Sequence, residues 1–275
     1  MTAGQTRLQA RLDALRAAGR KALVPFVTAG DPSLEATVPV MHALAQAGAD
    51  VIELGVPFSD PMADGPVIQR SSERALARGA GLSWVLDRVR AFRAGDAATP
   101  VVLMGYLNPV EIRGAAAFAA AAADAGVDGV LLVDLPPEEA DEYRAAFARH
   151  GLVLVSLASP TTPQARLARL ATGSEGYLYY VTFAGVTGAD RLDVGDAGQH
   201  LRALRAVATL PVYAGFGIRD AGSAAAMAAH ADGVVVGSAL VSALDGSADA
   251  QDAARRAGDF LRPLRQALDG LAAAA

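Results

Sequence analysis

The chain has 275 residues, of which 52% are hydrophobic and 19% charged, and its formal net charge is -5. This length can bury a large core, while the acidic balance and scattered arginines argue against nucleic acid as a partner. The sequence contains no cysteine, which excludes disulfides and thiolate metal sites, and its four histidines are far apart, so we expect no metal centre.

An amphipathic helix is expected first, from about Thr6 to Ala18. Charged residues interrupt its apolar positions, which excludes a signal peptide. No apolar run reaches the roughly 20 residues that a membrane helix needs, so we expect a cytoplasmic protein without membrane contact. Eight short apolar runs then predict buried strands: Ala22–Thr28, Ala49–Leu54, Pro100–Tyr106, Gly129–Asp134, Leu152–Leu157, Gly176–Val181, Pro211–Ala214 and Gly233–Val236. Helical patterns lie between them, for example Leu34–Ala47, Trp84–Arg93, Glu138–Arg149 and Ala197–Val207.

Continuous apolar strands that alternate with helices indicate parallel βαβ units. Eight such units in a chain of this length predict a TIM barrel, and the absence of a linker predicts one domain over residues 1–275 with an extra N-terminal helix. Three similar segments, 47–52, 125–130 and 230–235, support repeated units. The alternative is an open doubly wound sheet, which usually has fewer strands and a Gly-x-Gly-x-x-Gly turn that this chain lacks after its first strand.

Carboxylates cluster where the second predicted strand ends. Glu53 lies inside that apolar strand, and the loop from Gly55 to Pro66, stiffened by proline and glycine, carries Asp60 and Asp64. In a barrel the chemistry belongs at the C-terminal ends of the strands, and a carboxylate there suits general acid–base catalysis. The alternative is that these acids are solvated or cap turns. For Asp60 this alternative is about as well supported as a catalytic role, because Ser-Asp-Pro is an ordinary turn signal.

Glycine motifs follow the last three strands and predict an anion site. They are Gly185–Gly188, Gly215–Gly217 and Gly237-Ser238, and the last precedes a short helical stretch, Ala239–Leu244. Glycine allows backbone N–H groups to approach an anion, and barrels often bind phosphate with the loops after strands seven and eight. The three motifs together therefore predict a phosphate site made of neutral donors and a helix N-terminus.

These stretches, together with Val24–Pro32, resemble the α subunits of tryptophan synthase over essentially the full chain, and Glu53–Pro66 is the most specific match. The resemblance implies a TIM barrel that cleaves indole-3-glycerol phosphate to indole and glyceraldehyde 3-phosphate, as part of a carbon–oxygen lyase of tryptophan biosynthesis. It implies no cofactor in this chain, but a β-subunit partner that carries pyridoxal phosphate in an α2β2 complex.

The resemblance also implies roles for residues. Glu53 and Asp64 would be the catalytic pair. Independently of the resemblance, the length of the loop from Thr182 to about Gly195 predicts a lid, in which Thr187 could bond Asp64 on closure; the alternative is an ordinary glycine-rich connector. The remaining implied sites are the indole pocket of Phe26, Met104, Leu131, Tyr179 and Phe216, the phosphate site of Gly188, Gly217, Gly237 and Ser238, and the partner interface of Pro57, Asp60 and Asn108.

Two positions depart from the pattern of the family. Some members carry Arg where this chain has Phe183, and some carry a bulkier residue than Gly105. The resemblance therefore does not define how the loop closes or the fine shape of the pocket. Two rival functions remain: a sugar-phosphate epimerase or isomerase of the phosphate-binding barrels, and a non-catalytic subunit that only regulates its partner. The first would usually need a metal or a catalytic His or Lys at a strand end, and the second is disfavoured by the presence of both carboxylates.

Overall fold

Eight parallel strands close into a barrel in the computed structural model, which describes residues 5–163, 165–167, 170, 175–181, 194–215 and 217–273. Each strand pairs with its sequence neighbours, and β1 pairs with β8 to close the barrel. The predicted TIM barrel is therefore confirmed. The strands are β1 (Ala22–Thr28), β2 (Ile52–Gly55), β3 (Val101–Gly105), β4 (Gly129–Leu132), β5 (Val153–Ala158), β6 (Leu178–Val181), β7 (Val212–Gly215) and β8 (Gly233–Val236).

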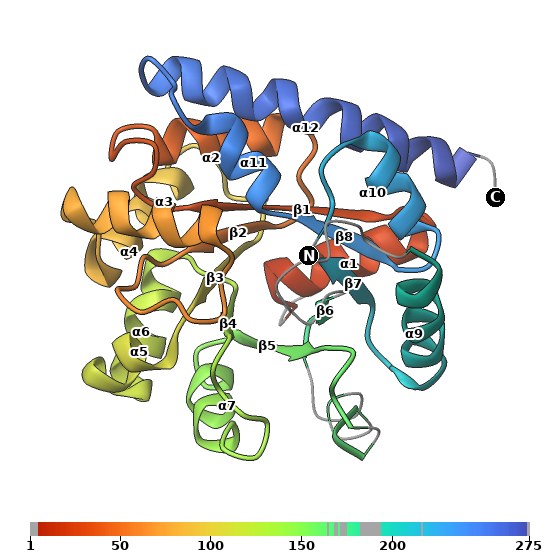
Figure 1. Ribbon diagram of the computed structural model, residues 1–275. Coiled ribbons are helices and arrows are strands. Elements are labelled where there is room, and N and C mark those ends of the chain that lie inside the picture. The colour runs from red at the N-terminus through yellow and green to blue at the C-terminus, as the bar shows by residue number, and fades with distance from the viewer. Residues whose placement is uncertain are drawn as a thin grey trace.

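Helices surround the barrel, and the long helix α12 lies across α2 and α10 on its outside (Figure 1). None of the described helices is long and apolar enough to cross a bilayer. The helices are α1 (Arg7–Ala17), α2 (Thr37–Gln46), α3 (Pro66–Ala77), α4 (Leu82–Arg93), α5 (Leu107–Arg113), α6 (Ala115–Ala125), α7 (Asp141–Ala148), α9 (Val194–Val207), α10 (Ala221–Ala228), α11 (Ser238–Leu244) and α12 (Ala250–Ala273).

Helix α1 is the predicted extra N-terminal helix. The side chain of Thr6 caps it by accepting a hydrogen bond from the N–H of Gln9 at 3.2 Å. Its apolar face, made of Leu8, Leu12 and Leu15, is buried in the same cluster as the inward-facing strand residues. The helix therefore closes one end of the barrel interior with apolar side chains.

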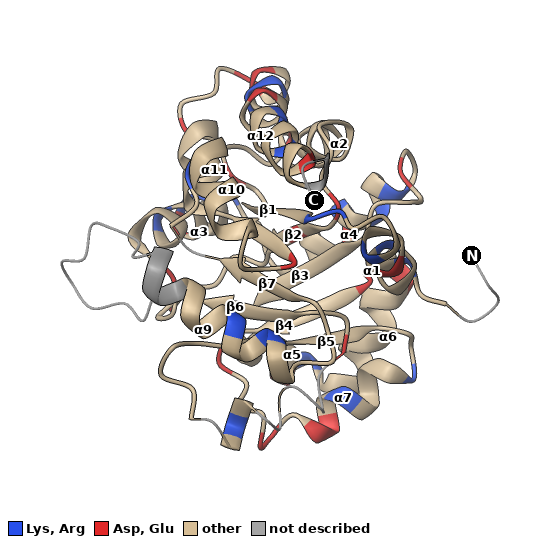
Figure 2. Ribbon diagram, turned by 90° about the vertical axis from the view of Figure 1, so that its right-hand side faces the viewer, with Lys and Arg blue, Asp and Glu red and all other residues tan. Residues whose placement is uncertain are grey.

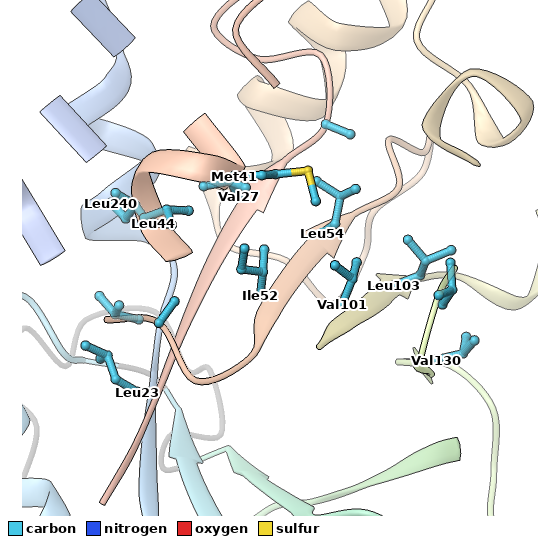
Figure 3. Packing of buried hydrophobic residues seen from close by; sticks show 14 of the residues in the cluster. Leu23, Val27, Met41, Leu44, Ile52, Leu54, Val101, Leu103, Val130 and Leu240 are labelled. Atoms are coloured by element: carbon cyan, nitrogen blue, oxygen red, sulfur yellow. The ribbon is translucent and has the colours of Figure 1, made fainter. Parts of the chain in front are cut away.

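Strand residues alternate between two buried clusters, because successive side chains point to opposite faces. In β1, Leu23 and Val27 belong to the outer cluster, which packs against the helices, while Val24 belongs to the barrel interior. Figure 3 shows the outer cluster, where Met41 of α2 and Leu240 of α11 lie over the strands. Both faces of each strand are covered, which explains why the sequence runs are continuously apolar.

Several boundaries differ from the sequence expectation. β2 begins at Ile52 instead of Ala49, α2 at Thr37 instead of Leu34, and α7 at Asp141, after a turn in which Glu139 N–H bonds the carbonyl of Pro136. α9 begins at Val194, so the loop predicted from Thr182 to about Gly195 ends slightly earlier. A sequence pattern defines the ends of strands and helices less well than their centres, because the apolar run continues into the flanking turns.

Charged residues of both signs lie on the outer helices, as Figure 2 shows for α12. Three buried or partly buried aspartates form a separate set at the ends where strands begin. The aspartates of the three similar sequence segments occupy equivalent places just before β2, β4 and β8. Each accepts a hydrogen bond from a backbone N–H of the preceding strand, and we call these contacts the strand-start clasps. The three bonds run from Leu23 N to Asp50 at 2.8 Å, from Val101 N to Asp128 at 2.8 Å and from Val212 N to Asp232 at 3.0 Å.

Arginines from neighbouring helices complete the clasps. Asp50 is fully buried and pairs with Arg265 of α12 at 2.9 Å and with Arg11 of α1 at 2.6 Å. Asp128 pairs with Arg93 at 2.7 Å, and Asp232 pairs with a more exposed arginine of α9 at the same distance. A buried carboxylate is costly unless it is paired, so these cations make the placement of the aspartates tolerable.

Candidate active site

A cavity of about 180 Å³ opens at the C-terminal ends of the strands, opposite the end that α1 closes. It brings together residues from distant parts of the sequence, among them both predicted catalytic carboxylates. Its described lining is Phe26, Glu53, Asp64, Gly65, Pro66, Val67, Ile68, Met104, Tyr179, Gly217, Ile218, Val235, Gly237 and Ser238. No Lys, Arg or His is among these described residues, so no cation balances the carboxylates there.

Glu53 lies on β2 and is fully buried. Its Oε1 accepts a hydrogen bond from the hydroxyl of Tyr177 at 2.7 Å, while its Oε2 has no hydrogen-bond partner among the described residues. Burial raises the pKa of Glu53 to about 7, although the Tyr177 hydrogen bond lowers it in part. A carboxyl group with a pKa near neutrality can both donate and accept a proton, which suits general acid–base catalysis.

Asp64 lies on the loop before α3 and faces the same cavity. Its Oδ2 accepts a hydrogen bond from the hydroxyl of Tyr106 at 3.0 Å. Burial raises the pKa of Asp64, and the Tyr106 hydrogen bond opposes that effect. The two carboxylates thus share a cavity but differ in their hydrogen-bond partners. Such an arrangement allows one carboxyl group to act as a proton donor while the other stays ionised.

Three of the predicted indole-pocket residues, Phe26, Met104 and Tyr179, line the cavity. Two glycines make room for these aromatic walls: a Cβ at Gly55 would lie 2.6 Å from the ring of Phe26, and a Cβ at Gly215 only 2.2 Å from the Tyr179 oxygen. Gly215, predicted within a phosphate motif, therefore has a packing role as well. Leu131 is fully buried in the barrel interior and is not part of the described lining.

Three of the predicted phosphate residues also line this cavity, namely Gly217, Gly237 and Ser238. Gly217 has a φ of 77°, a left-handed conformation that favours glycine. Gly237 and Ser238 stand where α11 begins. The predicted residues Thr187, Gly188 and Phe216 lie outside the described residues, as do Phe183 and the loop from 182 to 193.

The three predicted partner-facing residues differ in exposure. Asp60 and Asn108 are exposed, whereas Pro57 is buried. Two large apolar side chains near them are unusually exposed: Met62, two residues after Asp60, and Ile112, one helical turn after Asn108, are 84% and 81% exposed. Gly105, a position of family variation, lines a small separate pocket that shares Phe26, Asp64 and Met104 with the cavity, and a Cβ there would lie 3.3 Å from Val56.

Sequence reasoning missed the two tyrosines that bond the carboxylates. Tyr177 shares the inward face with Tyr179, because residues two apart on a strand point the same way. That period of two could have identified it. Nothing local identifies Tyr106, whose partner Asp64 lies 42 residues away. Ile68 and Val235 were also missed, as apolar walls of the cavity.

A closed parallel barrel with a buried glutamate and a half-buried aspartate at the C-terminal ends of its strands defines a (β/α)8 enzyme equipped for acid–base chemistry. A profile of the tryptophan synthase alpha chain family matches residues 12–268. The chain therefore belongs to the tryptophan synthase alpha chain family.

Relatives and solved structures agree with this assignment. The tryptophan synthase alpha chain of Xanthomonas campestris pv. campestris is 68% identical over 270 residues, which cover 98% of this chain and 99% of that protein. The crystal structure of tryptophan synthase subunit alpha from Legionella pneumophila has a TM-score of 0.90 at 46% identity and covers 97% of this chain and 100% of that chain. Tryptophan synthase from Mycobacterium tuberculosis, in an aminoacrylate-bound form, has a TM-score of 0.84 at 36% identity and covers 96% and 100% of the two chains.

Proposed function

We propose that this chain performs the reaction of its family, the retro-aldol cleavage of indole-3-glycerol phosphate to indole and glyceraldehyde 3-phosphate, with Glu53 and Asp64 as its catalytic residues. The observation that carries the assignment of residues is that both carboxylates line one cavity and none of its described lining residues is a cation. A carboxylate without a cationic partner retains its capacity to accept or donate protons to a substrate.

Glu53 is the proposed acid and base. With a pKa of about 7, a useful share of Glu53 is protonated at neutral pH and can deliver a proton to C3 of the indole ring. The resulting glutamate then accepts the proton of the side-chain hydroxyl. As that O–H bond breaks, the carbonyl of the aldehyde forms, the C3–C bond breaks, and its electron pair restores the aromatic indole.

Asp64 is the proposed electrostatic partner of the ring nitrogen. Protonation at C3 gives the indole nitrogen a positive charge, and a nearby carboxylate stabilises that charge in the transition state. Asp64 is suited to this only when it is ionised. Its hydrogen bond from Tyr106 favours the ionised form, against the effect of burial.

The substrate has an apolar ring and an anionic end, and the cavity offers a match for each. The aromatic walls at Phe26 and Tyr179 suit the indole, and Gly217, Gly237 and Ser238 suit the phosphate through neutral donors. We extend the phosphate assignment to Gly188, and the indole assignment to Phe216 and Leu131, from the family resemblance. Thr187 is proposed as a residue that bonds Asp64 on substrate binding.

The proposed partner is a β subunit in an α2β2 complex, with pyridoxal phosphate bound by that subunit and no cofactor in this chain. The exposed residues Asp60 and Asn108, with Met62 and Ile112 beside them, offer the combination of polar and apolar contacts that protein interfaces use. We also assign Pro57, which is buried in the free chain, to the partner-facing segment from the family resemblance. We propose that the complex works in the cytoplasm.

The decisive experiment is an assay of indole release from indole-3-glycerol phosphate by the purified chain, alone and with a β subunit. We expect slow release by the chain alone and faster release in the complex. Glu53→Gln is the matched control, because the amide keeps the shape of the side chain but cannot exchange the proton. No release under either condition would reject the reaction, whereas equal release by Glu53→Gln would reject only the assigned residue.

A further inference from the structure

Tyr106 stands between β3 and α5, and its hydroxyl connects two successive residues of the catalytic loop. The hydroxyl oxygen accepts a hydrogen bond from the backbone N–H of Ala63 at 3.0 Å and lies 3.0 Å from Oδ2 of Asp64. A backbone N–H can only donate, so the Tyr106 oxygen is the acceptor in that contact. Its own proton is therefore directed to the Asp64 carboxylate.

The ring of Tyr106 is held firmly in place. It is 5% exposed and stacks on Phe58 with 5.0 Å between ring centroids and 25° between planes. The next residue, Leu107, donates its N–H to Asp134 at 2.8 Å. The backbone next to the ring is thus anchored to the barrel through Leu107, and the ring itself packs against the loop through Phe58, so the hydroxyl is held from both sides.

The loop around Asp64 gains its shape from few contacts. The N–H of Asp64 bonds the carbonyl of Pro61 at 3.1 Å, and within the described part of the chain the Tyr106 hydroxyl is the only group that hydrogen-bonds the Asp64 carboxylate. The titratable groups that face Asp64 from the packed elements are Tyr106, Glu53 of β2 and Tyr179 of β6. None of these is a cation, so among the described side chains it is this hydrogen bond that stabilises a negative charge at Asp64.

We propose that Tyr106 is a positioning residue of the reaction, whose hydroxyl holds the Asp64 carboxylate at the cavity wall in the orientation that receives the indole nitrogen. The proposal rests on the proposed function of Asp64. Tyr106 also adjoins both partner-facing segments, since it precedes Asn108 by two residues and stacks on Phe58, the neighbour of Pro57. Partner contact at either segment thus has a direct mechanical route to Asp64.

The test is Tyr106→Phe, which keeps the ring and its stacking and removes only the hydroxyl. A hydrogen bond to a charged group is worth enough that we expect kcat for indole release to fall roughly 10- to 100-fold. KM should change less than about twofold, because the phosphate and the indole walls are untouched. The acid limb of the kcat/KM profile should move to higher pH, since Asp64 loses the contact that favours its ionised form.

The matched control is Tyr143→Phe, which removes another tyrosine hydroxyl that bonds a carboxylate, that of Glu111, away from the cavity. We expect this variant to keep the wild-type kcat and pH profile. A merely structural role for Tyr106 would lower stability and leave the pH profile in place, so thermal unfolding of both variants is measured beside the assay.

If Tyr106→Phe folds poorly, 3-fluorotyrosine introduced at position 106 carries the test, because its hydroxyl is a stronger donor in nearly the same volume. We expect the acid limb to move to lower pH. A wild-type chain that releases no indole would reject the proposed function itself. An active wild type with an unchanged profile in the Phe variant, or in the fluorotyrosine protein, would overturn only the role of Tyr106.

Discussion

The two ends of the barrel use the same kind of residue in opposite ways. At the ends where β2, β4 and β8 begin, aspartates are bonded to arginines and to backbone N–H groups of the neighbouring strand. At the other end, Glu53 and Asp64 have tyrosine hydroxyls as their hydrogen-bond partners and no cation among the described lining residues. Paired carboxylates stabilise the fold, and carboxylates without a cation retain proton chemistry for a substrate.

The largest expected effect is on turnover. Glu53→Gln and Asp64→Asn should each lower kcat by about 10²- to 10⁴-fold, the usual size of a lost proton transfer or charge contact. Both variants should remain folded, because neither residue has a cationic partner among the described lining residues to leave behind. Steady-state indole release together with circular dichroism checks this. Normal turnover in either variant would remove that residue from the mechanism.

The strand-start clasps should show the reverse behaviour. Asp50→Asn removes the buried charge that pairs with Arg265 and Arg11 and leaves the buried guanidinium of Arg265 with Asp269 alone, which should lower the free energy of unfolding by about 3–5 kcal/mol. The kcat of the remaining folded protein should stay at the wild-type value. Urea unfolding measures the first quantity and titrated active sites the second. Asp87→Asn, which breaks an exposed pair with Arg90, is the control and should unfold like the wild type.

The pH dependence of stability sharpens the contrast. Because the folded pKa of Glu53 is about 7, above its ordinary value of 4.5, the folded chain binds this proton more tightly than the unfolded chain. Its stabilising contribution is complete below pH 4.5 and is lost as the pH rises through 7, by about 3 kcal/mol in total. Urea unfolding of the wild type and Glu53→Gln at pH 5 and pH 8 tests this. If the variant loses as much unfolding free energy between pH 5 and pH 8 as the wild type, the pH dependence must come from a group other than Glu53.

The smallest effect concerns the phosphate side of the cavity. Ser238→Ala removes one neutral donor near the start of α11, so KM should rise roughly fivefold, as expected for about 1 kcal/mol. The value of kcat should change little. Inhibition by inorganic phosphate should weaken by a similar factor, and an unchanged phosphate affinity would contradict the assignment of Ser238.

The barrel could be predicted from the sequence because its strands are continuously apolar and regularly spaced. Glu53 could be singled out as a residue of the site because an acid inside such a strand is conspicuous, and it does line the cavity. The sequence did not predict α3 or α5, since their apolar faces are short and interrupted by charged residues. The tyrosine partners could not be inferred from local pattern, because Tyr177 is 124 residues from Glu53. The repeated Asp segments were recognised as repeated units, but their pairing with arginines from α1, α4, α9 and α12 is a property of the closed barrel.

The strand-start clasps also bear on how the barrel opens. Each clasp bonds an even-numbered strand to the strand before it, β2 to β1, β4 to β3 and β8 to β7, and none of the three bonds crosses from one such pair to the next. The chain is thus fastened in units of two strands, and such units are natural candidates for cooperative opening. Native-state hydrogen exchange would then reveal the amides of Leu23, Val101 and Val212 exchanging together with their own strand pairs, as three separate units within one continuous sheet.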